Sequence, residues 1–405
     1  MRHTDFKTGL TTPAWSAVTQ RLGFDALFQD FADGAAERDV ARRPIFEETA
    51  ELKRRGFGAV RLNGATLPEL FALARDLATA DPNIAHVFRN HFFAVEQHLK
   101  TAADPFSAHV LDLARDNRMF GVAFSETTTS AAGGRNQVPG ARLEPAGDGY
   151  RVSGTKIYST GNIYADHLFA SALDPDDNIQ QFFIATKASG VILEDDWDGF
   201  GQKLTGSGKT VFDNVAISTD DLFVLPTPDP DAPYLYHYTF HQVYLTTVIS
   251  GIVNRILLDA LNLVRGRSRN FYHALAERPA DEPELQAVIG RIAGYRAAVL
   301  AVTDRAIAAL DLAWSRIGQP EAHHLSVAAS IAAAEAKVVV DETAAQLAGL
   351  LIDVSSGSGV SASRALDRHW RNIKVIAAHN PRIYKERIIG DHYLNGALPP
   401  TGAFF

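Results

Sequence analysis

The chain has no cysteine among its 405 residues. Disulfide bonds, thiolate nucleophiles and cysteine-ligated metal or iron–sulfur centres are therefore excluded. A basic balance is also missing, because 47 acidic residues outnumber 39 lysines and arginines and give a formal net charge of -8. Nucleic acids and anionic membranes require clustered positive charge, so we expect neither as a partner.

Long hydrophobic runs are absent too, since no stretch of about 18 apolar residues is uninterrupted. The first residues include Arg2, His3, Asp5 and Lys7 and lack the apolar segment of a secretory signal. We therefore expect a cytoplasmic protein. With 46% hydrophobic and 21% charged residues, the chain is expected to bury a large core in roughly two or three domains.

Helical patterns frame a central β-like region. Between Pro82 and Lys100 apolar residues recur at i, i+3 and i+4, which predicts a helix. Residues 141–158 predict two strands around a turn at 146–149. Beyond residue 238, segments rich in alanine and leucine predict long helices that pack closely as a bundle.

Two further features separate these regions. Gly133-Gly134 interrupts the chain, and residues 221–234 form a connector rich in proline and aspartate. The fold class is therefore predicted as α+β, with an N-terminal α-helical domain at 1–118, a middle β-domain at 119–225 and a C-terminal helical bundle at 226–405.

Two segments of the middle region, GYRVSGTKIYSTGNIYADHLFA and DDWDGFGQKLTGSGKTVFDNV, resemble the middle domain of the acyl-CoA dehydrogenase superfamily of flavoproteins. They are most similar to its oxygen-using branch, the flavin-dependent monooxygenases. The resemblance covers nearly the whole chain. It implies an acyl-CoA dehydrogenase-like fold, a bound flavin and a homotetramer.

The resemblance assigns contacts to the flavin ring. Tyr158, Ser159 and Thr160 match the strand end beside the central ring, where a hydroxyl or backbone donor reaches the N5 edge. Ser125 matches a turn at the pyrimidine edge, although Thr127 replaces the proline that relatives carry there. From the residues alone, serine and threonine before a glycine simply end a strand.

Two aromatic residues follow in the second segment. Trp197 and Phe200 are candidates for an aromatic wall over the flavin or the substrate, and the glycines around them allow tight turns. The alternative is a glycine-punctuated hairpin with two core aromatic side chains, which the pattern favours for Trp197.

An arginine cluster is a candidate phosphate site. Arg265 and Arg269 are spaced i, i+4, as on one helical face, with Arg267 opposite. The resemblance implies that an arginine here reaches the flavin phosphate across a subunit boundary, and Arg267 and Arg269 stand nearest the matching position. A solvated basic face is the alternative.

The C-terminal segment bears on the reaction. Where many acyl-CoA dehydrogenases carry the glutamate that removes the α-proton of the substrate, this chain has His379-Asn380-Pro381. Asparagine is no general base, so dehydrogenation loses its chemistry at the expected place. The segment resembles the His-Asp-Pro-like segment of sulfur-metabolising monooxygenases.

Two histidines are candidate proton donors. Pro381 disfavours helical backbone at the residue before it, so the preceding helix is predicted to end near His379. A histidine there is suited to proton exchange, or alternatively caps its helix. His91 matches an Asn-His-Phe on the helix under the flavin, and is alternatively a core residue. We assign His91, His379 and Thr160 as catalytic.

Two other motifs give only weak evidence of a binding site. Residues 357–362 match a loose dinucleotide fingerprint, but they follow a helical pattern and lack the acidic residue that such sites place further on, so we expect an interhelical loop. His323-His324 are adjacent and do not share a helix face, so no metal site is predicted.

These observations predict a reduced-flavin-dependent monooxygenase. Reduced FMN, supplied by a separate flavin reductase because no nicotinamide domain is evident, reacts with O2, and one oxygen atom passes to a small substrate. The resemblance favours organosulfur compounds, and FMN over FAD. The alternatives are an FAD-dependent acyl-CoA dehydrogenase or oxidase with a relocated base, and a non-catalytic flavin-binding subunit.

Overall fold

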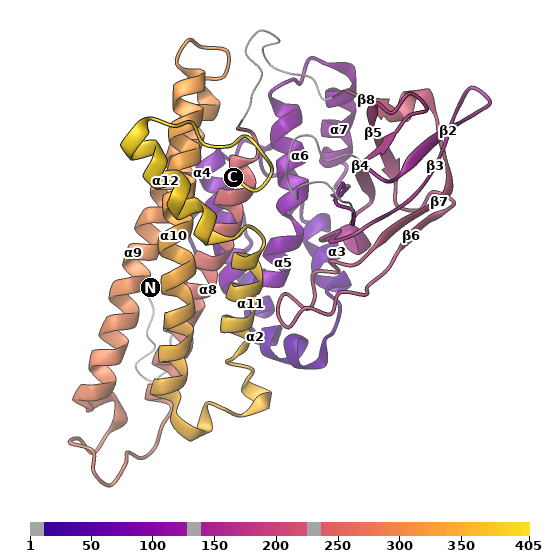
Figure 1. Cartoon of the computed structure of the whole chain (residues 1–405). Helices are drawn as coiled ribbons and strands as arrows, with labels where there is room; N and C mark the ends of the chain where they lie inside the picture. Colours follow the sequence, from indigo (N-terminus) through magenta and orange to yellow (C-terminus); the bar gives the residue numbers. More distant parts are fainter. Residues whose placement is uncertain (1–11, 128–138, 225–235) are drawn as a thin grey trace.

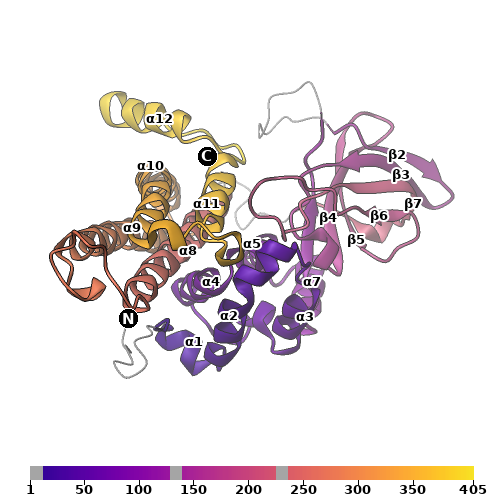
Figure 2. The same cartoon turned by 90° about the horizontal axis from the view of Figure 1, so that it is seen from below.

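A computed structural model describes residues 12–127, 139–224 and 236–405. Figures 1 and 2 show a β-sheet on one side of the molecule and the long C-terminal helices on the other, with the N-terminal helices between them. The largest buried hydrophobic cluster joins the N-terminal helices to the C-terminal bundle, and a second cluster lies within the sheet region.

The first part of the chain is helical. Its helices are α1 (Ala17–Arg21), α2 (Asp25–Ala41), α3 (Phe46–Arg54), α4 (Leu67–Ala80), α5 (Pro82–Val87), α6 (Arg89–Leu99) and α7 (Pro105–Arg115). The single helix predicted over 82–100 is wrong in one respect, because the chain breaks it at Phe88. Apolar periodicity continues through the break, so the pattern alone does not reveal it.

A mostly antiparallel sheet follows. Its strands are β1 (Phe120–Ala123), β2 (Arg142–Ala146), β3 (Gly149–Lys156), β4 (His167–Leu173), β5 (Ile179–Ala185), β6 (Val191–Leu193), β7 (Thr210–Ile217) and β8 (Leu222–Phe223). The described strands are ordered β6-β7-β3-β2-β4-β5-β8, with β1 parallel to β4. Ala146 pairs with Gly149, which confirms the predicted turn at 146–149, and Gly147 supplies its positive φ of 62°.

The second helical part contains α8 (Thr239–Arg265), α9 (Pro283–Ser315), α10 (Ala322–Ser355), α11 (Arg368–Ala378) and α12 (Arg382–Asn395). Helix α8 is long and apolar enough to span a membrane, but 72% of its most apolar window is buried inside the protein, as expected of a core helix. At Gly251 a Cβ would press on Arg75 and Ala78, so glycine lets α8 approach α4 closely.

The predicted α+β class is confirmed, with strands flanked by helical regions on both sides of the sequence. The exact domain boundaries stay a prediction. The Gly133-Gly134 interruption and most of the 221–234 connector lie outside the described residues.

Candidate functional site

The end of β3 brings three of the predicted flavin contacts to one loop. The backbone N–H of Ile157 donates to the Ser125 carbonyl at 2.8 Å, so Ser125 lies beside this loop. Tyr158 has a φ of 55° and a side chain that is 66% exposed. Its ring meets Trp197 edge-on, with ring centroids 6.2 Å apart. An exposed aromatic ring at a strand end is suited to contact a planar ligand.

Ser159 and Thr160 are buried in the same loop. The Thr160 and Ser207 hydroxyl oxygens lie 2.8 Å apart in a hydrogen bond. The Ser159 hydroxyl is buried and has no hydrogen-bond partner among the described residues. Buried hydroxyls are normally paired, so this oxygen is one place where a ligand would supply the missing partner.

This loop presses against the N-terminal helices. The Asn90 side chain on α6 donates from Nδ2 to the Thr160 carbonyl at 3.2 Å. Gly161 has a φ of 85°, and a Cβ there would come within 2.9 Å of the Val87 carbonyl oxygen. Only glycine combines this backbone conformation with so close an approach. The predicted ring contacts are therefore fixed directly against α5 and α6.

Residues 194–209 form a loop that lies on α11. The core position favoured for Trp197 is wrong, because Trp197 is only half-buried. Phe200 is 54% exposed and stacks on Trp370 with centroids 5.9 Å apart. The Gln202 backbone N–H donates to Asn372 Oδ1 at 2.7 Å. The loop thus carries aromatic surface next to Tyr158 and is anchored to the helix that leads to His379.

His379 lies where the sequence predicts, as the C-cap of α11, two residues before Pro381. Its Nε2 is 3.3 Å from the Arg89 guanidinium, which is the donor, so Nδ1 carries the proton of the neutral ring. Burial, together with the charges of Arg89 and His86, holds the pKa of His379 well below its usual value. The ring is therefore neutral at physiological pH.

His86 and Gln202 extend this group. His86 Nδ1 and Gln202 Oε1 are 2.9 Å apart in a hydrogen bond, while His86 Nε2 has no partner among the described residues. Burial lowers the pKa of His86 to about 3. The sequence analysis missed His86, Arg89 and Gln202. The sequence offers one hint, which is that Arg89 interrupts the apolar pattern of residues 82–100. That pattern does not predict which side chains surround Arg89.

His91 is less suited to catalysis than the sequence suggests. Its Nε2 lies 2.9 Å from the Gly58 carbonyl oxygen, and the Phe120 backbone N–H donates to its Nδ1 at 3.3 Å. Both ring nitrogens are thus engaged by backbone groups, and burial lowers the pKa of His91 to about 4. This geometry favours a structural role, because the ring links α6 to the start of β1.

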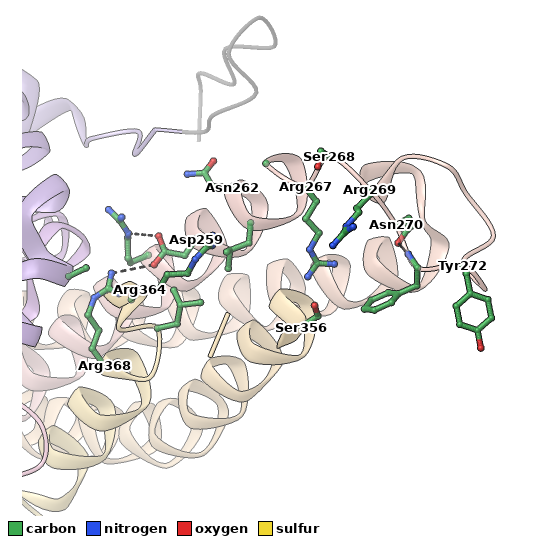
Figure 3. A pocket seen from close by; sticks show the side chains of 16 residues that line it. Asp259, Asn262, Arg267, Ser268, Arg269, Asn270, Tyr272, Ser356, Arg364 and Arg368 are labelled. Atoms are coloured by element: carbon green, nitrogen blue, oxygen red, sulfur yellow. Dashed lines mark hydrogen bonds and ion pairs between the residues drawn. The ribbon is translucent and has the colours of Figure 1, made fainter. Parts of the chain in front are cut away.

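The predicted phosphate arginines line a separate cavity of about 890 Å³ (Figure 3). The prediction that Arg265 and Arg269 share one helical face is wrong. Helix α8 ends at Arg265, and Gly266 leads into an irregular segment that carries Arg267 and Arg269. The Arg267 guanidinium donates to the Val354 carbonyl at the end of α10. Ser356, next to the predicted Gly/Ser loop, also lines the cavity.

The cavity is strongly cationic. Arg255, Arg364 and Arg368 line it beside Arg267 and Arg269. The acidic residue in its lining is Asp259, which pairs with Arg255 at 2.7 Å and with Arg368 at 3.4 Å. These contacts, together with a hydrogen bond from His369, offset burial and lower the pKa of Asp259. Guanidinium groups in excess of carboxylates suit a phosphate.

The residues present fit a flavin mononucleotide in two parts. Tyr158 and the unpaired Ser159 hydroxyl suit a planar polar ring, and the arginine cavity suits its phosphate. Among the residues that the structure describes, none from the sheet region lines that cavity, so the described parts of one chain do not bring the two parts together. Within the described residues, no group of three or more His, Asp or Glu side chains is placed to hold a metal ion.

Residues 244–381 match the family model described as acyl-CoA dehydrogenase, C-terminal domain. The chain is 25% identical to a probable FMNH2-dependent monooxygenase, SfnC, of Pseudomonas putida, over 91% of this chain and 93% of that protein. It is also 25% identical to dibenzothiophene monooxygenase of Rhodococcus erythropolis, over 91% of each.

Solved structures show the same fold. Methanesulfinate monooxygenase MsuC of Pseudomonas fluorescens superposes with a TM-score of 0.84 at 24% identity, covering 97% of this chain and all (100%) of that one. The full length of this architecture is thus shared, from the N-terminal helices to the C-terminal bundle.

Proposed function

We propose that this chain, which has the acyl-CoA dehydrogenase-like fold and an acyl-CoA dehydrogenase C-terminal domain, is a reduced-flavin-dependent monooxygenase. It uses O2 to oxygenate a small, organosulfur-type substrate. The observation that carries the proposal is a helix end without a catalytic carboxylate, where Asn380 stands at the position of the glutamate and the neighbouring His379 is neutral and faces Arg89. The names of the relatives support FMN as the cofactor.

The flavin would be held by residues from two regions. Tyr158 contributes an aromatic face, Ser159 and Thr160 contribute hydroxyls to the ring edge, and Ser125 lies beside them. Arg267 and Arg269 bind the phosphate. When bound in its reduced form, the flavin supplies the two electrons needed to activate O2.

We propose that His379 positions the reacting group by donating a hydrogen bond to it, because the neutral ring has no proton acidic enough to give up. Its Nδ1 carries the proton, has no hydrogen-bond partner among the described residues, and is buried away from solvent. Arg89 orients the ring by donating to Nε2. Because both ring nitrogens of His91 face backbone groups, we assign this hydrogen bond to His379 and leave catalysis by His91 as an untested prediction.

Dehydrogenation is the weaker alternative. It requires a carboxylate near His379, yet Asn380 occupies the neighbouring position, and no described carboxylate is paired with Arg89 or hydrogen-bonded to His379. An enzyme of this kind with a relocated base would lose its flavin absorbance on anaerobic addition of an acyl-CoA.

The partners follow from the proposed reaction. A separate flavin reductase supplies reduced FMN, and O2 and a small molecule are the co-substrates. Because the ring contacts and the phosphate arginines lie apart in one chain, we propose that neighbouring subunits of a homotetramer complete each site. We further propose that the protein is cytoplasmic.

Oxygen transfer is tested by supplying the purified protein with FMN, a flavin reductase, NADH and ¹⁸O2, together with thioethers, sulfones, sulfinates and amines. Mass spectrometry should find one product that has gained a single labelled oxygen atom. Products without label, or consumption of O2 with every substrate left unchanged, would contradict the proposal. The second outcome would favour a non-catalytic flavin-binding subunit if the protein still binds flavin.

A further inference from the structure

Arg89 is a buried cation that has no counterion among the described residues. Three arginines of the described residues are buried, namely Arg38, Arg89 and Arg368, with exposures of 3%, 7% and 5%. Arg38 pairs with Asp81 at 2.9 Å, and Arg368 pairs with Asp259 at 3.4 Å. For Arg89 the described residues provide no carboxylate, and its hydrogen bond runs to His379, a neutral ring. A buried, unpaired charge is strongly unfavourable.

Hydrogen-bond donors without partners occur in the same group. Among the described residues, the buried atoms Arg89 Nε, His379 Nδ1, Gln202 Nε2 and Asn380 Nδ2 have no acceptor, whereas two acceptors, His86 Nε2 and Asn380 Oδ1, have no donor. Arg89 is hydrogen-bonded to His379, and Asn380 follows His379 in the chain. Gln202 is hydrogen-bonded to His86, whose charge acts on His379. A cluster in which donors outnumber acceptors is arranged to receive an acceptor-rich group.

The surrounding charges have the same sign. Lys337 and Lys385, on α10 and α12, lie close enough for their charges to lower the pKa of His379. The nearby carboxylate is Asp341, which is already paired with Lys337 at 2.6 Å. His241 on α8 is kept neutral because burial and the charge of Arg89 hold its pKa well below the usual value. The group therefore has a net positive charge.

We propose that Arg89 binds an anionic group of the substrate, a two-oxygen anion such as a sulfinate or a carboxylate. The guanidinium presents a planar fork of donors that matches two oxygens on one atom, and burial strengthens the pairing. His379 Nδ1 and Gln202 Nε2 complete the anion's hydrogen bonds. This inference rests on the proposed function in placing the substrate beside His379, and it narrows the substrate to a small anion.

Calorimetric titration of the full-length protein tests this assignment without any turnover. The probes are sodium methanesulfinate, sodium acetate and the neutral dimethyl sulfone, which is similar in size. We expect both anions to bind and dimethyl sulfone to bind at least tenfold more weakly. Arg89→Met should weaken anion binding about thirtyfold or more, because a buried ion pair loses one partner. Arg89→Lys should restore only part of the affinity.

Arg382→Met is the matched control, since Arg382 on α12 pairs with Glu342 at the surface. It should bind the anions as the unchanged protein does. Arg89→Met should melt at the same or a higher temperature in the absence of anions, so a folding defect is separable from lost binding. Equal binding of anions and dimethyl sulfone, no binding of either anion, or unchanged anion affinity in Arg89→Met would each overturn the inference.

Reduced FMN is titrated in parallel to keep the two proposals apart. Anion binding at Arg89 without reduced-FMN binding would contradict the monooxygenase and leave the anion site standing. If the protein binds reduced FMN and oxygenates only a neutral substrate, the monooxygenase proposal stands and the anion site at Arg89 is contradicted. Comparison of acetate with methanesulfinate distinguishes carboxylate from sulfinate as the preferred group.

Discussion

Lys385 shows at the scale of one residue how burial sets charge near the proposed site. Its ammonium donates to the Phe404 carbonyl at 2.5 Å and lies 3.8 Å above the Phe405 ring. Neither group is a full counterion. Burial and the charge of Lys337 therefore lower the pKa of Lys385 to about 7. When Lys385 is protonated, its burial lowers the free energy of unfolding of the protein.

Lys385→Met is predicted to stabilise the protein at low pH. In the unfolded chain lysine has a pKa of about 10.4, so between pH 7 and 10 the unfolded state binds more protons and the stability of the unchanged protein rises with pH. Below pH 7 both states are protonated and the penalty is full. The variant should gain about 2 kcal/mol at pH 6, after allowing for the lost contacts, and little at pH 10.

Denaturant unfolding at pH 6, 8 and 10 measures this difference, with Lys187→Met, an exposed lysine, as the control. A difference between Lys385→Met and the unchanged protein that does not vary with pH would contradict the assignment.

Sequence reasoning at this scale succeeds where one residue constrains its own backbone. Pro381 predicts the end of α11 at His379, and the structure confirms it. It fails where the outcome depends on distant partners. Nothing local to Arg89 reveals that the described part of the chain gives it no carboxylate, and nothing local to His91 reveals that Gly58 and Phe120 engage its ring.

At the scale of elements, the 194–209 loop depends on its close approach to α11. A Cβ on Gly201 would overlap the backbone of Arg371. The adjacent Gln202 is fixed to Asn372, so the loop has little room to move aside. Phe200 and Trp370 stack across the same contact.

Gly201→Ala is predicted to lift this loop from α11. Overlap with backbone cannot be relieved by a rotamer change, so we expect a loss of about 1–3 kcal/mol in the free energy of unfolding. The near-ultraviolet circular dichroism of the Phe200–Trp370 stack should change, and reduced-FMN affinity should fall. In Gly349→Ala on α10 the new Cβ meets open space, so that variant should leave both signals unaltered. An unchanged spectrum in Gly201→Ala would contradict the expected displacement.

Local patterns predict elements better than their interruptions. The β2–β3 hairpin follows from alternation around Gly147, because turn chemistry is local. The break at Phe88 and the end of α8 at Arg265 were missed, because apolar or charged periodicity continued past both points. The second error misplaced Arg269 on a helical face that the chain never forms.

For the whole molecule, the central proposal is a flavin site shared between chains. The ring contacts at Tyr158–Thr160 follow the end of β3 in the chain, whereas Arg267 and Arg269 follow the end of α8. Closed oligomers are the usual way to bring two such surfaces together. The resemblance implied this arrangement, and the periodicity of a single chain carries no information about it.

Mixed oligomers are predicted to regain flavin sites. Thr160→Ala and Arg267→Ala chains should each bind reduced FMN poorly, because each lacks one half of the site. Co-expressed with different tags, they should form oligomers in which about one quarter of the sites combine two intact halves. The measurement is reduced-FMN stoichiometry in doubly purified oligomers. No recovery above the separate variants would place both halves of the site within one chain.

The most direct test of the account is an anaerobic titration of the purified protein with reduced FMN. We predict saturable binding of one reduced FMN per chain, weakened in both Thr160→Ala and Arg267→Ala. Absence of binding to reduced FMN at any accessible concentration would contradict the claim that this protein uses a reduced flavin.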